Sequence, residues 1–187
     1  MISSRRMSGA CVAAFTTMFV ASVFAHDKTN FETRLVGYEE TPLTINSTGS
    51  GEFSAKISKD GTSIQYQLTY RDLPTSITQS HIHFGRPAIS GGIVLFLCTN
   101  LGNAPASVPT PQLCPTASPT TITGTLTAAD VIAIAGQSID PGTDGFAEIV
   151  RAIRAGAAYV NVHTTGHGGG EIRGALGRND GSDDDDD

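Results

Sequence analysis

The chain has 187 residues, of which 39% are hydrophobic, 16% charged and 6% aromatic. This composition fits one globular domain with tails and is too hydrophobic for a disordered chain, while 21 glycines and 9 prolines are too few for a collagen-like fibre. The formal net charge of −6 argues against nucleic-acid binding, because proteins that bind phosphate backbones are usually basic.

The two ends of the chain differ from its middle. Arg5 and Arg6 precede an uncharged apolar segment over 10–24, and Val23 and Ala25 are small residues at the positions that a signal peptidase reads. The sequence therefore predicts a signal peptide over 1–25, a globular domain over 26–178 and a disordered acidic tail over 179–187. We expect a secreted or periplasmic protein without an integral membrane segment after cleavage, since no apolar stretch reaches the roughly 20 residues that a spanning helix needs.

Most of the domain alternates apolar and polar residues with the period of a β-strand. Residues 53–58 and 64–70 alternate in this way on either side of Lys59-Asp60-Gly61-Thr62, a turn signal, so they predict an antiparallel hairpin. Further strands are expected over 31–37, 80–84, 92–98, 121–126, 158–163 and 171–176.

Two segments break the strand pattern. Thr127 is a typical N-cap, and we expect a short helix to follow it through Ala135. Further along, apolar residues recur on one helical face before Gly156, at Phe146, Ile149, Val150 and Ile153. About eight short strands with one or two short helices predict an all-β fold, a Greek-key or immunoglobulin-like β-sandwich.

Two cysteines remain once the signal peptide is removed. In an oxidising compartment Cys98 and Cys114 are expected to form a structural disulfide around an aperiodic loop. Such a bond stabilises a fold by roughly 3 kcal/mol in the chain-entropy model. The alternative, a redox or metal-binding cysteine pair, lacks the close C-x-x-C spacing.

Histidines are the residues most suited to chemistry. His81 and His83 share one face of a strand, and His163 lies on the face of a later strand opposite Val160 and Val162. If the two strands are neighbours, the three imidazoles project away from the core and converge on a site for copper, zinc, iron or nickel. The alternative is structural, because a strand histidine often only hydrogen-bonds a carbonyl or a carboxylate.

Five short motifs lie along the domain. They are His81-Ile82-His83-Phe84-Gly85, Gly92-Ile93-Val94, Leu126-Thr127-Ala128-Ala129-Asp130, Tyr159-Val160-Asn161-Val162-His163-Thr164 and Gly169-Gly170-Glu171-Ile172-Arg173-Gly174. Glu171 and Arg173 lie in the last motif, where they share a strand face and are candidates for a cross-strand ion pair, and Asn161 lies in the motif before it. Together the motifs resemble the CHRD (chordin) domain family over about residues 30–177. The resemblance implies an extracellular β-sandwich and leaves the molecular role open.

A second resemblance, to copper,zinc superoxide dismutase, implies that His81, His83 and His163 are copper ligands. His167, in the glycine-rich turn, is the candidate for a fourth metal ligand. The chain departs from that family because no zinc loop is recognisable between His83 and His163, and because Glu171 stands near the place of an anion-guiding arginine, with Arg173 close by. We therefore expect a lone copper site rather than a complete dismutase.

Two functions follow from these patterns. The first is an exported, non-catalytic binding or envelope module with an unknown partner, since the sequence has no Gly-x-Ser-x-Gly, His-Glu-x-x-His or phosphate-loop motif. The second is a copper-binding redox protein that uses His81, His83 and His163. Copper is the one cofactor that the sequence suggests.

Overall fold

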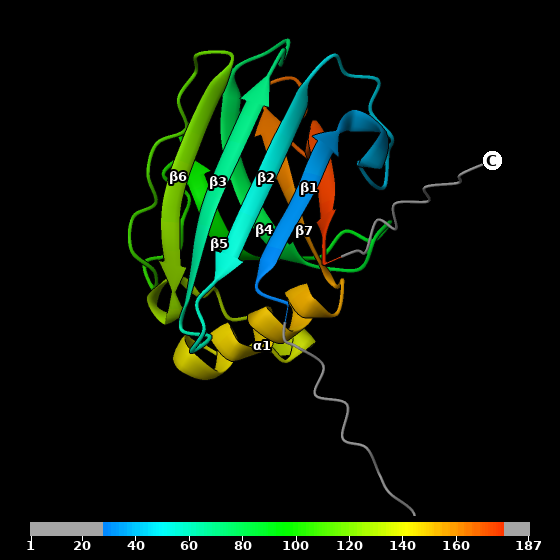
Figure 1. The fold of residues 1–187 in the computed structure, drawn as a ribbon. Helices are drawn as coiled ribbons and strands as arrows, with labels where there is room; N and C mark the ends of the chain where they lie inside the picture. Colours follow the sequence, from blue (N-terminus) through cyan, green and yellow to red (C-terminus); the bar gives the residue numbers. More distant parts are fainter. Residues whose placement is uncertain (1–27, 178–187) are drawn as a thin grey trace, which may run out of the picture.

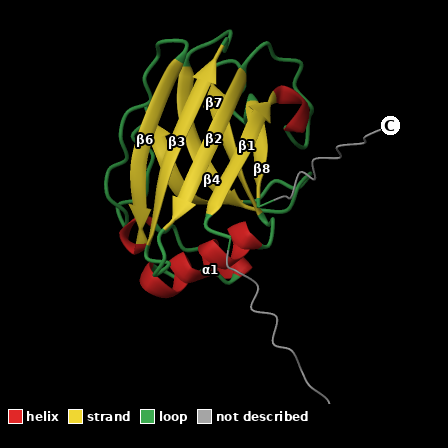
Figure 2. Cartoon of the chain, viewed as in Figure 1, coloured by secondary structure: helices red, strands yellow, loops and turns green. Residues whose placement is uncertain are grey.

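The computed structural model describes residues 28–177, so the expected signal peptide and acidic tail lie outside the described residues. Within this part, eight strands and one α-helix make an all-β antiparallel fold that is nearly barrel-shaped (Figures 1 and 2). The strands are β1 (Asn30–Val36), β2 (Ser50–Ile57), β3 (Ser63–Arg71), β4 (Ile77–Phe84), β5 (Gly92–Thr99), β6 (Thr120–Thr127), β7 (Ala158–Thr164) and β8 (Ile172–Leu176). The α-helix is α1 (Gly142–Arg154), and short 3₁₀ turns are η1 (Gly37–Glu39), η2 (Ala128–Asp130) and η3 (Ala135–Gln137).

All eight strands belong to one sheet, in the order β5-β4-β7-β8-β1-β2-β3-β6. In Figure 1, β6, β3, β2 and β1 form the layer nearest to the viewer, and β5, β4 and β7 lie behind them. A bridge between Val36 and Arg173 joins β1 to β8, so the two layers are continuous. Accumulated strand twist curls such a sheet around its own core. The eight antiparallel strands confirm the expected all-β class, whereas a sandwich or Greek-key arrangement is not confirmed.

The predicted hairpin is confirmed. Strands β2 and β3 pair from Ser50 with Arg71 to Ile57 with Ile64, and inward-facing residues such as Leu68 are fully buried. The turn needs Gly61, whose φ of +71° is a left-handed conformation that glycine adopts without steric cost.

Strands β5 and β6 are the two edges of the sheet, and side-chain hydrogen bonds link these edges across the seam between them. Tyr66 on β3 donates a hydrogen bond of 2.8 Å to the Leu97 carbonyl of β5. Gln112 donates to the Tyr66 hydroxyl at 2.7 Å and to the Thr123 carbonyl of β6 at 3.1 Å. The predicted disulfide between Cys98 and Cys114 is confirmed and holds the loop that carries Gln112 against this seam.

Helix α1 lies across one end of the curled sheet (Figure 1). Its apolar face is buried as predicted, through Phe146, Ile149, Val150 and Ile153. The helix expected after Thr127 is shorter than predicted. Thr127 does cap it, together with the Asp130 side chain, but the turn ends at Asp130. Val131 then takes an extended conformation with its side chain in the core, so burial of this β-branched residue ends the helix early.

Candidate metal site

The candidate site is built on the paired strands β4 and β7. They are antiparallel neighbours, with His81 opposite Asn161, His83 opposite Tyr159 and Gln79 opposite His163. Alternation sends Ile82 and Val160 into the apolar core, so the histidines occupy the other face of the strands. The pairing brings together residues that are 82 positions apart in the sequence.

The three imidazoles converge. Their ring centroids are separated by 5.0 Å for His81 and His163, 5.4 Å for His81 and His83, and 6.2 Å for His83 and His163. One nitrogen from each ring can be chosen so that all three lie within 4.8 Å of one another. Donors about 2.0–2.1 Å from one ion are themselves about 3.3–4.2 Å apart. A shift of a few tenths of an ångström would therefore let the three nitrogens share an ion.

The rings turn away from the core, yet they are not exposed. The exposed fractions of His81, His83 and His163 are 0%, 7% and 6%. The Phe96 ring of β5 meets His81 edge-on at 4.4 Å between centroids. Main-chain carbonyls from two loops complete the cover, from Gly91 over His83 and from Gly168 over His163.

Hydrogen bonds at Nδ1 leave ring lone pairs on the inner side of the cluster. The Nδ1 of His83 lies 3.0 Å from the Gly91 carbonyl, and the Nδ1 of His163 lies 3.0 Å from the Gly168 carbonyl. Since a carbonyl only accepts, each Nδ1 carries a hydrogen and each neutral ring keeps a lone pair at Nε2. The Nε2 of His163 is 3.2 Å from the Nδ1 of His81.

Two buried nitrogens of this cluster have no hydrogen-bond partner within residues 28–177. They are the Nε2 atoms of His81 and His83. A buried polar atom left in this state costs about 1–3 kcal/mol. Such orphaned atoms in a folded protein call for an unseen partner, and a cation suits a lone pair.

The cluster is electrically neutral at physiological pH. Burial lowers the pKa of His81 to about 2, helped by repulsion from His163 and His83. Burial also lowers the pKa of His83 to about 4 and lowers the pKa of His163. Neutral imidazole is the form that binds metals.

A stack of three side chains supports His83 from one side. The Tyr159 ring lies parallel to the His83 ring, with centroids 4.7 Å apart, and the Arg173 guanidinium lies 3.4 Å from the Tyr159 centroid. Arg173 donates hydrogen bonds to the carbonyls of Arg86 at 3.3 Å and Ile89 at 2.9 Å. The Gly91 amide donates to the Tyr159 hydroxyl at 3.1 Å. Arg173 thus fixes both the ring behind His83 and the loop in front of it.

Glu171 and Arg173 bind different partners rather than each other. The buried carboxylate of Glu171 accepts hydrogen bonds from Ser47 at 2.6 Å and from Thr164 at 2.5 Å. The Thr164 hydroxyl in turn accepts from the backbone amide of His167 at 3.1 Å. Glu171 therefore orders the glycine-rich turn whose Gly168 carbonyl orients His163.

Of the two remaining predicted residues, Asn161 belongs to the histidine cluster and His167 does not. Asn161 is buried inside the cluster, and its side-chain amide lies 3.0 Å from the Nε2 of His163; since that Nε2 carries a lone pair, the amide must present its NH₂ group there and donate. The side chain of His167 is outside the group of converging ligand atoms.

Glu40 is a buried acid that no sequence pattern pointed to. Its carboxyl packs against Gly170, where an added Cβ would stand 2.4 Å from Oε1, and that oxygen has no hydrogen-bond partner within residues 28–177. Burial raises the pKa of Glu40 to about 7, although the charge of Arg173 acts against the rise. Glu40 precedes the cis proline peptide after Thr41 in an aperiodic loop, so nothing in its spacing marks it.

Comparison with known protein families agrees with this architecture. A family model described as the CHRD domain matches residues 31–176. The chain belongs to the CHRD domain family. A search of curated proteins and a search of solved structures gave no significant match. The family and the Cys98–Cys114 disulfide of this CHRD domain are consistent with an extracellular location. None of the helices within residues 28–177 is long and apolar enough to cross a membrane.

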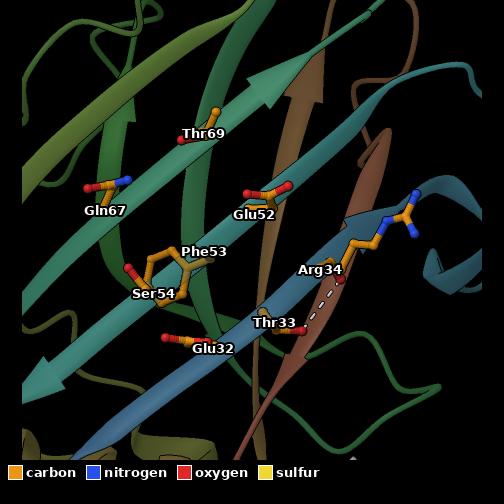
Figure 3. A pocket seen from close by; sticks show the side chains of 8 residues that line it. All are labelled: Glu32, Thr33, Arg34, Glu52, Phe53, Ser54, Gln67 and Thr69. Carbon is orange, nitrogen blue, oxygen red and sulfur yellow. Dashed lines mark hydrogen bonds between the residues drawn. The ribbon is translucent and has the colours of Figure 1, made fainter.

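The CHRD domain also has a shallow hollow of about 450 Å³ on the outer face of β1, β2 and β3 (Figure 3). Its polar side chains include Glu32, Arg34, Glu52, Gln67 and Thr69. Glu52 already pairs with Arg71 at 2.6 Å, and Thr69 shares a hydrogen bond of 2.8 Å with Thr121. These contacts are ordinary for a solvated sheet face, so the hollow gives a weaker indication of a ligand than the unpartnered nitrogens of the histidine cluster.

Proposed function

We propose that this CHRD domain is an exported, non-catalytic module that binds one transition-metal ion through His81, His83 and His163, with copper as the intended metal. The observation that carries the proposal is the pair of buried, unpartnered Nε2 atoms of His81 and His83 beside a third imidazole, with one nitrogen from each ring within 4.8 Å of the others. A purely structural cluster would be expected to satisfy its own nitrogens.

The donor set fits copper. Imidazole nitrogen suits copper, zinc, iron and nickel, and among divalent first-row ions copper binds nitrogen donors most tightly. His83 and His163 have fixed Nδ1 hydrogens that hold their rings in the binding tautomer, as second-shell partners do at metal sites. When bound, the metal would add a Lewis-acidic or redox-active centre to a domain that otherwise has no catalytic constellation.

The expected location supports the same proposal. A signal peptide over 1–25 would deliver the chain to an oxidising compartment, where the Cys98–Cys114 disulfide persists. Because those cysteines are joined to each other, they do not compete with the histidines for a soft metal.

Metal analysis of the mature protein, purified without a histidine tag, tests the proposal. We expect near-stoichiometric copper after reconstitution and its loss in His163→Ala. His167→Ala is the matched control, since its side chain lies outside the converging group and should leave the metal content unchanged. If neither copper nor zinc binds the folded wild-type protein, the proposal fails.

The alternative is a module that binds its extracellular partner without metal, for which the hollow of Figure 3 is the candidate surface. It predicts that substitution of Gln67 by Lys impairs partner binding, whereas His163→Ala leaves partner binding and metal content as they were. Measurement of metal content in both variants separates the two functions.

A further inference from the structure

Resting on the proposed function, we infer that the histidine site is selective for monovalent copper, Cu(I), over Cu(II) and Zn(II). The feature that points to Cu(I) is the charge of the site: three neutral donors, fully desolvated, with a fixed cation behind one of them.

The donors bring no negative charge to the ion. The converging group contains His81, His83 and His163 and no carboxylate within residues 28–177. The ring hydrogens of His83 and His163 go to the neutral carbonyls of Gly91 and Gly168 rather than to acids. The remaining polar group at the cluster, the Asn161 amide, is also neutral. Any charge on the bound ion therefore stays uncompensated by its nearest neighbours.

Burial penalises a divalent ion more than a monovalent one. The energy needed to move an ion from water into a low-dielectric interior grows with the square of its charge, so the intrinsic penalty is about four times larger for Cu(II) or Zn(II) than for Cu(I). The exposed fractions of 0–7% leave little solvent to relieve this penalty. Three protein donors leave the remaining positions of the Zn(II) and Cu(II) shells to water, and exposed fractions of 0–7% leave little access for water.

Arg173 adds a second charge-dependent cost. Its guanidinium stacks on Tyr159, which stacks on His83, and its positive charge is one of the causes that lower the pKa of His83. The same repulsion acts on a metal ion and is twice as large for a divalent as for a monovalent ion. Glu40 offsets part of this charge, but burial raises its pKa to about 7, which weakens the offset at neutral pH.

The test compares the Kd of Cu(I), Cu(II) and Zn(II) for the mature wild-type protein at pH 7. Cu(I) is measured anaerobically with ascorbate by competition with bathocuproine disulfonate, and the divalent ions by competition with nitrilotriacetate. We expect the Kd of Cu(I) to be at least about a hundredfold below that of Zn(II) and at least tenfold below that of Cu(II).

Two variants change the charge in opposite ways. Arg173→Gln removes the cation, and Asn161→Asp adds an anion while leaving the Arg173 contacts in place. Both should raise divalent affinity more than Cu(I) affinity, with a change in log Kd about twice as large for the divalent ions. Arg34→Gln, on the outer face of β1 beside the hollow of Figure 3, is the matched control and should leave the selectivity unchanged.

The outcomes are distinct. If wild-type protein binds Zn(II) or Cu(II) as tightly as Cu(I), or if folded Asn161→Asp keeps the wild-type selectivity, the inference about Cu(I) is overturned while metal binding at the histidines stands. If no ion binds the folded wild-type protein, the proposed function itself is overturned.

Discussion

Replacement of His83 by phenylalanine separates a metal site from a structural histidine cluster. The new ring keeps the parallel stack on Tyr159, whose centroid lies 4.7 Å from that of His83, and fills nearly the same volume. It removes one buried Nε2 without a partner, which is worth about 1–3 kcal/mol, and it loses the hydrogen bond to the Gly91 carbonyl, which is worth about 0.5–1.5 kcal/mol. We therefore expect the stability of His83→Phe to lie between about 0.5 kcal/mol below and about 2.5 kcal/mol above that of the metal-free wild type.

The metal-loaded proteins should show the opposite order. At a free copper concentration about 100 times Kd, binding stabilises the wild type by about 2.7 kcal/mol, or about 5–10 °C in Tm for a domain of this size. His83→Phe should gain little from the same copper concentration. Urea denaturation and calorimetry, each with and without copper, measure both effects with the disulfide intact. A variant that is more than about 1 kcal/mol less stable than the metal-free wild type, together with no copper effect on the wild type, would refute the reasoning.

Three further predictions concern pH, the glycine-rich turn and the disulfide. Between pH 7 and pH 5 the metal-free protein should lose stability, because burial lowers the pKa of His81 to about 2 and of His83 to about 4, so only the unfolded chain takes up their protons. Each of these two histidines contributes a loss of about 1.9 kcal/mol, and His163, whose pKa burial also lowers, adds to the loss; Glu40, whose raised pKa of about 7 lets the folded chain take up a proton, offsets about 2 kcal/mol. Urea denaturation should show a net loss of at least about 2 kcal/mol in the wild type and a loss about 2 kcal/mol larger in Glu40→Gln, and equal losses in the two proteins would contradict the role given to Glu40. Thr164→Val removes a hydrogen bond to the buried Glu171 carboxylate and should lower the free energy of unfolding by about 1.5–3 kcal/mol. It should also weaken copper binding, because the turn that carries Gly168 loosens, and an unchanged copper Kd would show that this turn does not orient the site. Replacement of Cys98 and Cys114 by serine removes the disulfide without freeing thiols that bind copper; it should cost roughly 3 kcal/mol in urea denaturation and leave the copper stoichiometry unchanged, since the histidines lie on other strands.

Local patterns carried much of the fold. Alternation over 53–58 and 64–70 with the turn at Gly61 was enough to predict the β2–β3 hairpin, because each strand shows one face to the core and one to water. The four apolar residues on one face were likewise enough to predict helix α1. The order of strands in the sheet could not be predicted, because the bridge between Val36 and Arg173 that makes the sheet continuous has no periodic signal in the sequence.

The sequence predicted which strand face the three histidines occupy but not the residues that cover them. The spacing of His81 and His83 places both rings on one strand face, and the apolar Val160 and Val162 predicted that His163 faces the same way. Their burial comes from Gly91 and Gly168, which belong to irregular loops whose path depends on tertiary contacts. The stacking role of Tyr159 and the place of Glu40 were not predicted for the same reason, because each depends on a contact with Arg173 that sequence spacing does not show.

The contrast between the two layers of the sheet argues that the histidine cluster exists for a ligand. Strands β2 and β3 alternate apolar side chains that face the core with polar side chains that face water, so most polar groups there keep their solvent. Strand β7 is buried along its whole length, and one of its faces carries Asn161 and His163 where aliphatic residues would pack at lower cost. A polar layer that is only partly hydrogen-bonded is less stable than an apolar one, so stability alone would not retain it. Buried polar atoms are as a rule hydrogen-bonded, and a local departure from such a rule is typical of a functional site. A bound cation would satisfy the Nε2 lone pairs of His81 and His83, which have no partner within residues 28–177.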